Sequence, residues 1–161
     1  MTTTRPEAVI EAHPTLPIIT ITREFDATPA QLLRAHTDPE VFARWVGPKD
    51  LTTRIDRWDA SRGGHFRFVQ SRGDEEYAFY GSFHDITENR IVQTFTWEGQ
   101  PDGVSLETLT FEDLGDGRTR LRAQSLVESI ESRDAWLRSG METGVNDGYA
   151  KIDGLLTDGA L

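Results

Sequence analysis

Cysteine is absent from the 161-residue sequence, which excludes a disulfide framework, a thiolate nucleophile and a cysteine metal site. No run of about 18 apolar residues occurs either, so no transmembrane helix is predicted. The opening segment MTTTRPEAVIEAHPTLP lacks the apolar stretch of a secretory signal peptide. Together these absences predict a cytoplasmic protein that has no membrane anchor.

Positive charge is scarce: 17 lysines and arginines face 27 acidic residues, for a net charge of −10 at pH 7. Nucleic acids and anionic membranes repel such a chain unless a local basic patch overrides the total. The densest basic run, Arg118, Arg120 and Arg122, alternates along a predicted strand, and we interpret it as a solvated face balanced by nearby acids. We therefore expect neither a nucleic acid nor a membrane as partner.

Established catalytic motifs are also missing, since the chain contains no HExxH, GxSxG, P-loop or GxGxxG pattern. The four histidines lack metal-ligand spacing, so we expect no metal and no cofactor: His13, His36, His65 and His84. His65 follows a glycine pair and is a weak candidate for a general base, although a surface or hydrogen-bonded histidine is the simpler interpretation. Three acids on predicted strands are weak candidates for orienting a polar ligand group, against a simple exposed face: Asp56, Asp59 and Glu107.

The sequence predicts a flexible N-terminal tail, residues 1–15, followed by one domain over residues 16–158. LPIITITREFD is rich in β-branched residues and predicts a strand. Two short helices are predicted in TPAQLLRAHTDPEVFARWVGP: Thr-Pro starts the first, Asp-Pro starts the second, and Gly-Pro ends it.

From Leu51 to Glu128 apolar residues alternate with period two between turn signals, which predicts six consecutive antiparallel strands. From about Ser132 the pattern becomes helical. The fold class is therefore α+β. We predict a seven-stranded antiparallel sheet curled around one long C-terminal helix, with two short helices after the first strand, which is the helix-grip arrangement.

Three glycines, Gly140, Gly144 and Gly148, recur every fourth residue in the predicted last helix, although each costs a helix about 1 kcal/mol. Two explanations stay open: close backbone packing, or an internal cavity that admits a ligand. Aromatic residues on the strands suit the walls of a ligand cavity, but they suit a solid core equally well. The predicted ligand-binding residues are Trp45, Phe66, Phe68, Gln70, Tyr77, Phe79, Gln93, Phe95, Trp97, Trp136, Met141, Gly144, Val145 and Gly148, with the two glutamines and Tyr77 as polar groups that orient a ligand.

Four segments in order, TDPEVFARWVGP, RWDASRGGHFRF, YGSFHDITENRIVQTFTWEG and SGMETGVNDGYAKIDGLL, resemble the activator of heat-shock protein 90 ATPase homologue-like family. This family belongs to the SRPBCC, or START-like and pollen-allergen-like, superfamily. The resemblance covers about residues 18–157. It implies the helix-grip fold and a deep cavity, which in other members binds hydrophobic small molecules. Val145 stands where the family often has tryptophan or methionine, which implies an enlarged or reshaped pocket.

Three functions stay open at this point. We favour the binding of a small hydrophobic or aromatic molecule for transport, sensing or sequestration. The alternatives are a polyketide cyclase- or hydrolase-like enzyme using the same cavity, and a chaperone-regulating interaction domain. A convergent acid–base pair in the cavity would separate the first two, and the sequence alone does not identify one. Exposed edge strands would permit a homodimer.

Overall fold

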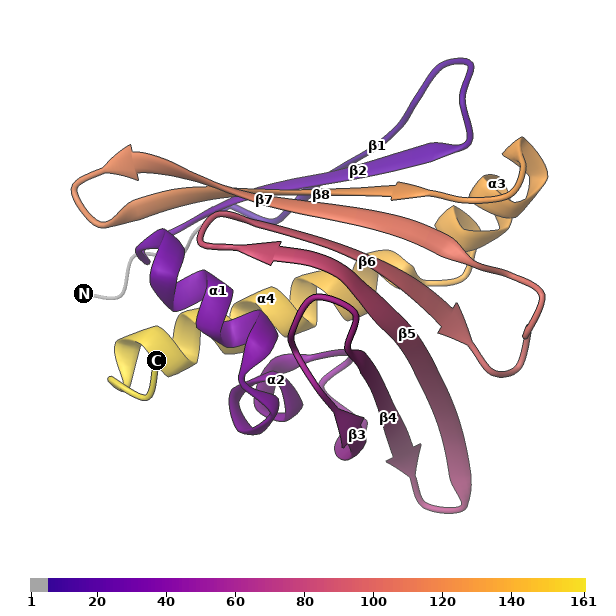
Figure 1. Cartoon of the computed structure of the whole chain (residues 1–161), viewed down its shortest axis with the longest axis horizontal. Helices are drawn as coiled ribbons and strands as arrows, with labels where there is room; N and C mark the ends of the chain where they lie inside the picture. Colours follow the sequence, from indigo (N-terminus) through magenta and orange to yellow (C-terminus); the bar gives the residue numbers. More distant parts are fainter. Residues whose placement is uncertain (1–5) are drawn as a thin grey trace.

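The computed structural model describes residues 6–161 as an antiparallel sheet that curves over a C-terminal helix (Figure 1). The elements in chain order are β1 (Val9–Ala12), β2 (Ile18–Phe25), α1 (Pro29–Thr37), α2 (Pro39–Trp45), β3 (Thr52–Trp58), β4 (His65–Arg72), β5 (Glu75–Thr87), β6 (Arg90–Trp97), β7 (Ser105–Gly115), β8 (Arg118–Leu126), α3 (Ile130–Arg138) and α4 (Met141–Thr157). This α+β architecture confirms the predicted fold class. No helix within this range is both long and apolar enough to cross a membrane.

The sheet follows the order β1-β2-β8-β7-β6-β5-β4-β3, and every neighbouring pair is antiparallel. α1 and α2 carry the chain from β2 to β3, at the far edge of the sheet. β3 to β8 then form the predicted meander, which ends with β8 beside β2. Register shifts interrupt the pairing of β3 with β4 and of β5 with β6. Such bulges increase the local bend of a sheet. Figure 1 shows α4 running along the concave side that results.

The prediction of seven strands is wrong, because the sheet has eight. The additional strand, β1, lies in residues 9–12, inside the segment assigned to a flexible tail, and pairs with β2 from Val9↔Thr22 to Ala12↔Ile19. Three of its four side chains are exposed, so it has no apolar alternation for sequence reasoning to detect. Residues 1–5 of the predicted tail lie outside the described residues.

The single long C-terminal helix is only partly confirmed, because two helices occupy this region. α3 begins at Ile130, close to the predicted start at about Ser132, and the side chain of Ser129 caps it by accepting a hydrogen bond from the backbone N–H of Ser132. Gly140 separates α3 from α4 with φ of 89°, a left-handed conformation that favours glycine. The first of the three glycines therefore serves the break between two helices rather than a helix face.

The core forms where alternate residues of the strands meet α4. In β2 the buried side is Ile19, Ile21, Arg23 and Phe25, as the period-two pattern requires. From α4, Ile152 is completely buried against this face, and such burial stabilises by about 1.5–3 kcal/mol. Arg23 donates two hydrogen bonds to the Asp153 carboxylate, at 2.9 and 2.5 Å, so an ion pair also joins the sheet to α4.

On the convex face, two of the three arginines in the basic run on β8 pair with acids, and the third, Arg122, is exposed. Arg118 Nη2 lies 2.7 Å from Glu24 Oε1, and Arg120 Nη1 lies 2.9 Å from Glu112 Oε2. The arginines alternate with the buried Thr119 and Leu121, so they point away from the core. The ion pairs agree with the interpretation of this run as a solvated strand face rather than a nucleic-acid site.

His36 of α1 is buried in the core. Its Nδ1 lies 2.8 Å from the carbonyl oxygen of Leu32, and its ring packs edge-on against Trp45 with 5.0 Å between centroids. Burial lowers the pKa of His36 from 6.5 to about 4. The folded protein therefore holds this imidazole neutral at pH values where the unfolded chain binds a proton.

This difference predicts an acid-sensitive component of stability. Between pH 7 and pH 5, the free energy of unfolding of the wild type is expected to fall by about 2 kcal/mol more than that of His36→Gln. The reason is that the His36 contribution is complete above the unfolded-state pKa of 6.5 and is lost as the pH falls toward the folded-state pKa of about 4. Urea denaturation followed by tryptophan fluorescence at both pH values measures the loss. Equal losses in the two proteins would contradict the prediction.

Candidate ligand-binding cavity

A cavity of about 310 Å³ lies between the concave face of the sheet and α4. Its walls come from β2, from α1 and α2, from β3 to β8, and from both C-terminal helices. Most of the residues predicted to bind a ligand line it: Trp45, Phe66, Phe68, Gln70, Phe79, Gln93, Phe95, Trp136, Met141, Gly144 and Val145. The structure therefore brings together side chains that are up to 100 positions apart in the sequence.

Strand alternation explains the aromatic wall. Phe66 and Phe68 share the inward side of β4, and Phe68 pairs with Phe79 of the neighbouring strand β5. The rings of Phe68 and Phe79 stack with 5.2 Å between centroids, and those of Phe79 and Phe95 with 5.3 Å. Because the rings of Phe68, Phe79 and Phe95 touch across three neighbouring strands, they form one continuous apolar surface.

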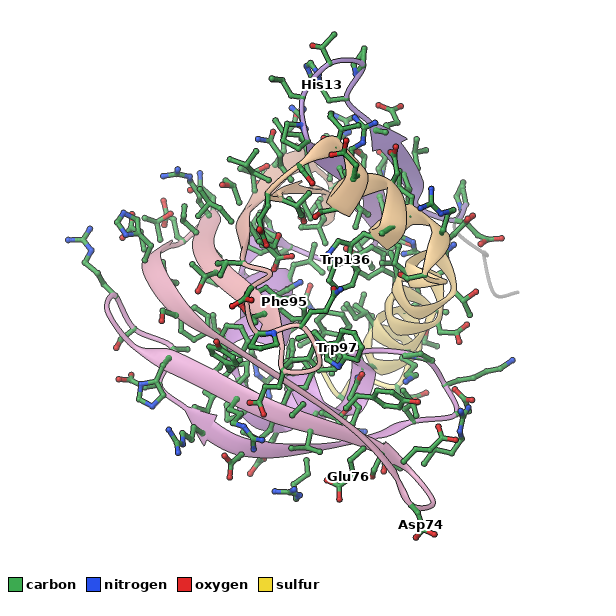
Figure 2. All side chains as sticks on the ribbon, turned by 90° about the vertical axis from the view of Figure 1, so that its right-hand side faces the viewer. His13, Asp74, Glu76, Phe95, Trp97 and Trp136 are labelled. Carbon is green, nitrogen blue, oxygen red and sulfur yellow. The ribbon has the colours of Figure 1, made fainter. Side chains whose placement is uncertain are left out.

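Four predicted residues do not reach this cavity. Tyr77 lies toward the tip of the β4–β5 hairpin, where Asp74 is labelled in Figure 2, and its hydroxyl donates to Glu75 at 2.9 Å. Trp97 lies one inward position beyond Phe95 and packs its indole ring against Gly99. Strand parity placed both on the correct face, but it does not show where a cavity ends along a strand.

His65, the weak candidate for a general base, is exposed and alternates with the buried Phe66. Its side chain therefore points away from the cavity, and the structure gives it no part in this site. The fourth exception is Gly148. A Cβ at Gly148 would lie 3.0 Å from the backbone oxygen of Trp45 and 3.3 Å from its ring, so this glycine allows close packing and encloses no space.

Gly144 differs from Gly148 although both lie on α4. A Cβ at Gly144 would lie 3.6 Å from Pro48 Cδ, an ordinary contact, and Gly144 itself lines the cavity. The two explanations offered for the glycines thus apply to different positions. Gly148 brings the helix backbone against the end of α2, and Gly144 leaves room at the edge of the cavity.

A polar row crosses the cavity wall on three neighbouring strands. Gln93 of β6 pairs with Glu107 of β7, which pairs with Ser125 of β8. Gln93 Nε2 donates to Glu107 Oε1 at 2.9 Å, and Ser125 Oγ donates to Oε2 at 3.2 Å. Burial raises the pKa of the Glu107 carboxyl, and these two hydrogen bonds only partly offset the effect.

Glu107 was one of three acidic candidates, and the other two lie outside the cavity. Asp56 is exposed and pairs with Arg67 at 3.2 Å, whereas Asp59 is exposed and accepts a hydrogen bond from Ser61. Glu107 differs because it shares the inward parity of Leu109 and Phe111, both buried. That parity is the sequence signal that distinguishes it from the other two acids.

Two further polar side chains line the cavity and were absent from the predicted set. Tyr149 of α4 has its pKa raised above the usual range, first by burial and then by the charge of Glu107. His36 is neutral near pH 7, as its lowered pKa requires. Nothing in the sequence pattern separates either from an ordinary core aromatic residue. Residues 6–161 contain no cluster of three or more histidine, cysteine or acidic side chains placed to hold a metal ion.

One side of the cavity adjoins a second depression of about 490 Å³, lined by the β6–β7 loop and by α3. Phe95 and Trp136 border both spaces. In Figure 2 these two residues and Trp97 gather between the sheet and the C-terminal helices. The depression is therefore a separate space beside the cavity, with Phe95 and Trp136 at the boundary between the two.

Comparison with known proteins finds a family model, described as Activator of Hsp90 ATPase homolog 1-like protein, that matches residues 26–157. Protein Ms6760 from Mycobacterium smegmatis has a similar structure, with a TM-score of 0.83, 23% identity, and coverage of 94% of this chain and 97% of that one. A protein from Arthrobacter aurescens gives a TM-score of 0.84, 23% identity, and coverage of 93% and 91%.

CalU16 from Micromonospora echinospora is more distant, with a TM-score of 0.60, 19% identity, and coverage of 94% of this chain and 88% of that one. At these identities the structural matches show the shared fold alone. A comparison with curated proteins finds no significant match.

The two glycines make a matched pair for a stability test. Gly144→Ala is expected to raise the free energy of unfolding by up to about 1 kcal/mol, because alanine favours a helix and the methyl group meets only an ordinary contact. Gly148→Ala is expected to lose that gain, and Gly148→Leu to destabilise clearly, because each added group meets the backbone of Trp45. Urea denaturation ranks the variants, and equal stability of the two alanine variants would contradict the packing assignment.

Proposed function

The chain belongs to the Activator of Hsp90 ATPase homolog 1-like family, and we propose that it binds a small hydrophobic or aromatic molecule in the cavity between the sheet and α4. The proposed setting is the cytoplasm, and the proposed role is transport, sensing or sequestration. The observation that carries the proposal is the cavity itself, since aromatic side chains surround space that they do not fill.

The size and chemistry of the cavity support this function. A volume of about 310 Å³ lies at the lower end of the range for small-molecule sites. Such sites are lined mainly by apolar and aromatic groups, with a few polar groups that orient the ligand. Phenylalanines of β4, β5 and β6 supply the apolar aromatic lining, and the row of Gln93, Glu107 and Ser125 supplies the polar groups.

A cyclase- or hydrolase-like enzyme is a second candidate, and one observation favours it. Glu107, Tyr149 and His36 line the same cavity, so a proton donor and a proton acceptor are available to one bound molecule. Chemistry would be detected as a change in the mass of a bound compound, whereas simple binding returns the compound unchanged. The chaperone-regulating role rests on family membership alone.

The binding function is tested by filling the cavity from α4. Val145→Trp is expected to weaken binding of the uncharged probe N-phenyl-1-naphthylamine at least about tenfold, because the indole occupies space that the probe needs. Thr143→Trp is the matched control, because Thr143 is exposed on the same helix. Probe fluorescence measures binding, and thermal melting checks the fold. Unchanged affinity in a folded Val145→Trp protein would contradict the function.

A further inference from the structure

Among the described residues that line the cavity, Glu107 is the only one with an acidic side chain. Its two carboxyl oxygens each receive one hydrogen bond, from Gln93 and from Ser125, both neutral donors. An ionised carboxyl offers about four acceptor positions, so capacity for further hydrogen bonds is left on the carboxyl group. Glu107 is only partly buried, and its remaining accessible surface forms part of the cavity lining.

No basic side chain within residues 6–161 forms an ion pair with Glu107. Arg23 of β2 is a buried cation whose charge reaches Tyr149, and both of its terminal nitrogens donate to the Asp153 carboxylate. His36 is neutral near pH 7. The lining therefore offers nothing to neutralise an anionic ligand, and Glu107 would repel one when ionised.

A cationic ligand is also disfavoured by this arrangement. Forming an ion pair inside apolar walls removes both charges from water, and that cost is recovered only where further hydrogen bonds satisfy both groups. The phenylalanine side chains of the wall neither donate nor accept such bonds. A neutral hydroxyl avoids this cost, because it donates and accepts hydrogen bonds with a carboxyl in either protonation state.

Tyr149 approaches from the opposite side, on α4. Its phenol keeps its proton near neutral pH and lines the same space, close enough for the Glu107 charge to affect it. No hydrogen bond from its hydroxyl to another residue of the described chain is present. The cavity thus has an acceptor on the sheet and a free phenolic group on the helix.

We propose that Glu107, held by Gln93 and Ser125, is the polar anchor of the cavity, and that the ligand is an uncharged aromatic molecule bearing a hydroxyl group. This inference rests on the proposed binding function and names the chemical class of the ligand. The hydroxyl hydrogen-bonds to Glu107 while the ring system lies against the phenylalanine wall of β4 to β6. Carboxylated aromatic compounds are excluded.

Four naphthalenes of one size test the proposal by displacing N-phenyl-1-naphthylamine: 2-naphthol, 2-methylnaphthalene, 2-(aminomethyl)naphthalene and 2-naphthoate. Wild type is expected to prefer 2-naphthol over 2-methylnaphthalene by about 3- to 10-fold, the effect of one hydrogen bond. 2-Naphthoate is expected to bind at least about tenfold more weakly than 2-naphthol, because its charge is not neutralised.

Two variants assign these preferences to Glu107. Glu107→Leu is expected to abolish the preference for 2-naphthol while keeping affinity for 2-methylnaphthalene. Glu107→Gln keeps the size of the side chain and an acceptor oxygen, so it is expected to retain part of the hydroxyl preference and to bind 2-naphthoate more tightly than wild type does. Glu107→Gln decides the question if the leucine variant does not fold.

Three other results would each contradict one part of the proposal. Equal affinity of wild type for 2-naphthol and 2-methylnaphthalene would overturn the anchor and leave the binding function intact. Tightest binding of the aminomethyl compound would replace the hydroxyl site with a cation site. Failure of the folded wild type to bind the probe and every uncharged compound would instead overturn the proposed function itself.

Discussion

The width of the cavity depends on the contact between Gly148 of α4 and the backbone that ends α2. With no side chain at Gly148, the helix reaches the carbonyl of Trp45, and the turn after α2 is then held from both sides. Lys151 Nζ donates to the carbonyls of Gly47 and Pro48 at 3.2 and 3.3 Å, and Gln70 of β4 donates to Val46 at 3.2 Å. This turn therefore acts as a spacer between α4 and the sheet, and the cavity is the space that the spacer leaves beside it.

Much of the fold was predictable because most elements carry a strong periodic signal. The meander from β3 to β8 alternates clearly, and α1 and α2 begin at Thr-Pro and Asp-Pro as predicted. β1 escaped prediction because its stability comes from pairing with β2 and not from burial of its own side chains. The break at Gly140 escaped prediction because periodicity continues across it, whereas only φ distinguishes a left-handed glycine from a helical one.

The sequence predicted which face of the sheet lines the candidate site, but not how far the site extends along each strand. Alternation correctly placed the aromatic residues of β4, β5 and β6 on the inward face, but the position of the cavity along each strand depends on where α4 crosses the sheet. Tyr77 and Trp97 were therefore placed on the correct face and too far along their strands. The polar row around Glu107 was not predictable. Cross-strand register aligns Glu107 with Gln93 and Ser125, and a single sequence does not contain that register.

The cavity lining includes residues of two helices, α3 and α4, that no continuous run of helical hydrogen bonds joins. Trp136, which borders both the cavity and the neighbouring depression, belongs to α3, and the left-handed Gly140 interrupts the helical hydrogen bonds between α3 and α4. α3 is held instead through Arg133, which donates to the carbonyls of His13 and Leu16 in the β1–β2 connection at 2.6 and 2.9 Å. The Trp136 side of the lining is thus tied to the N-terminal hairpin, whereas the α4 side is tied to α2 through Gly148, so separate segments of the chain hold the two sides of one cavity in place.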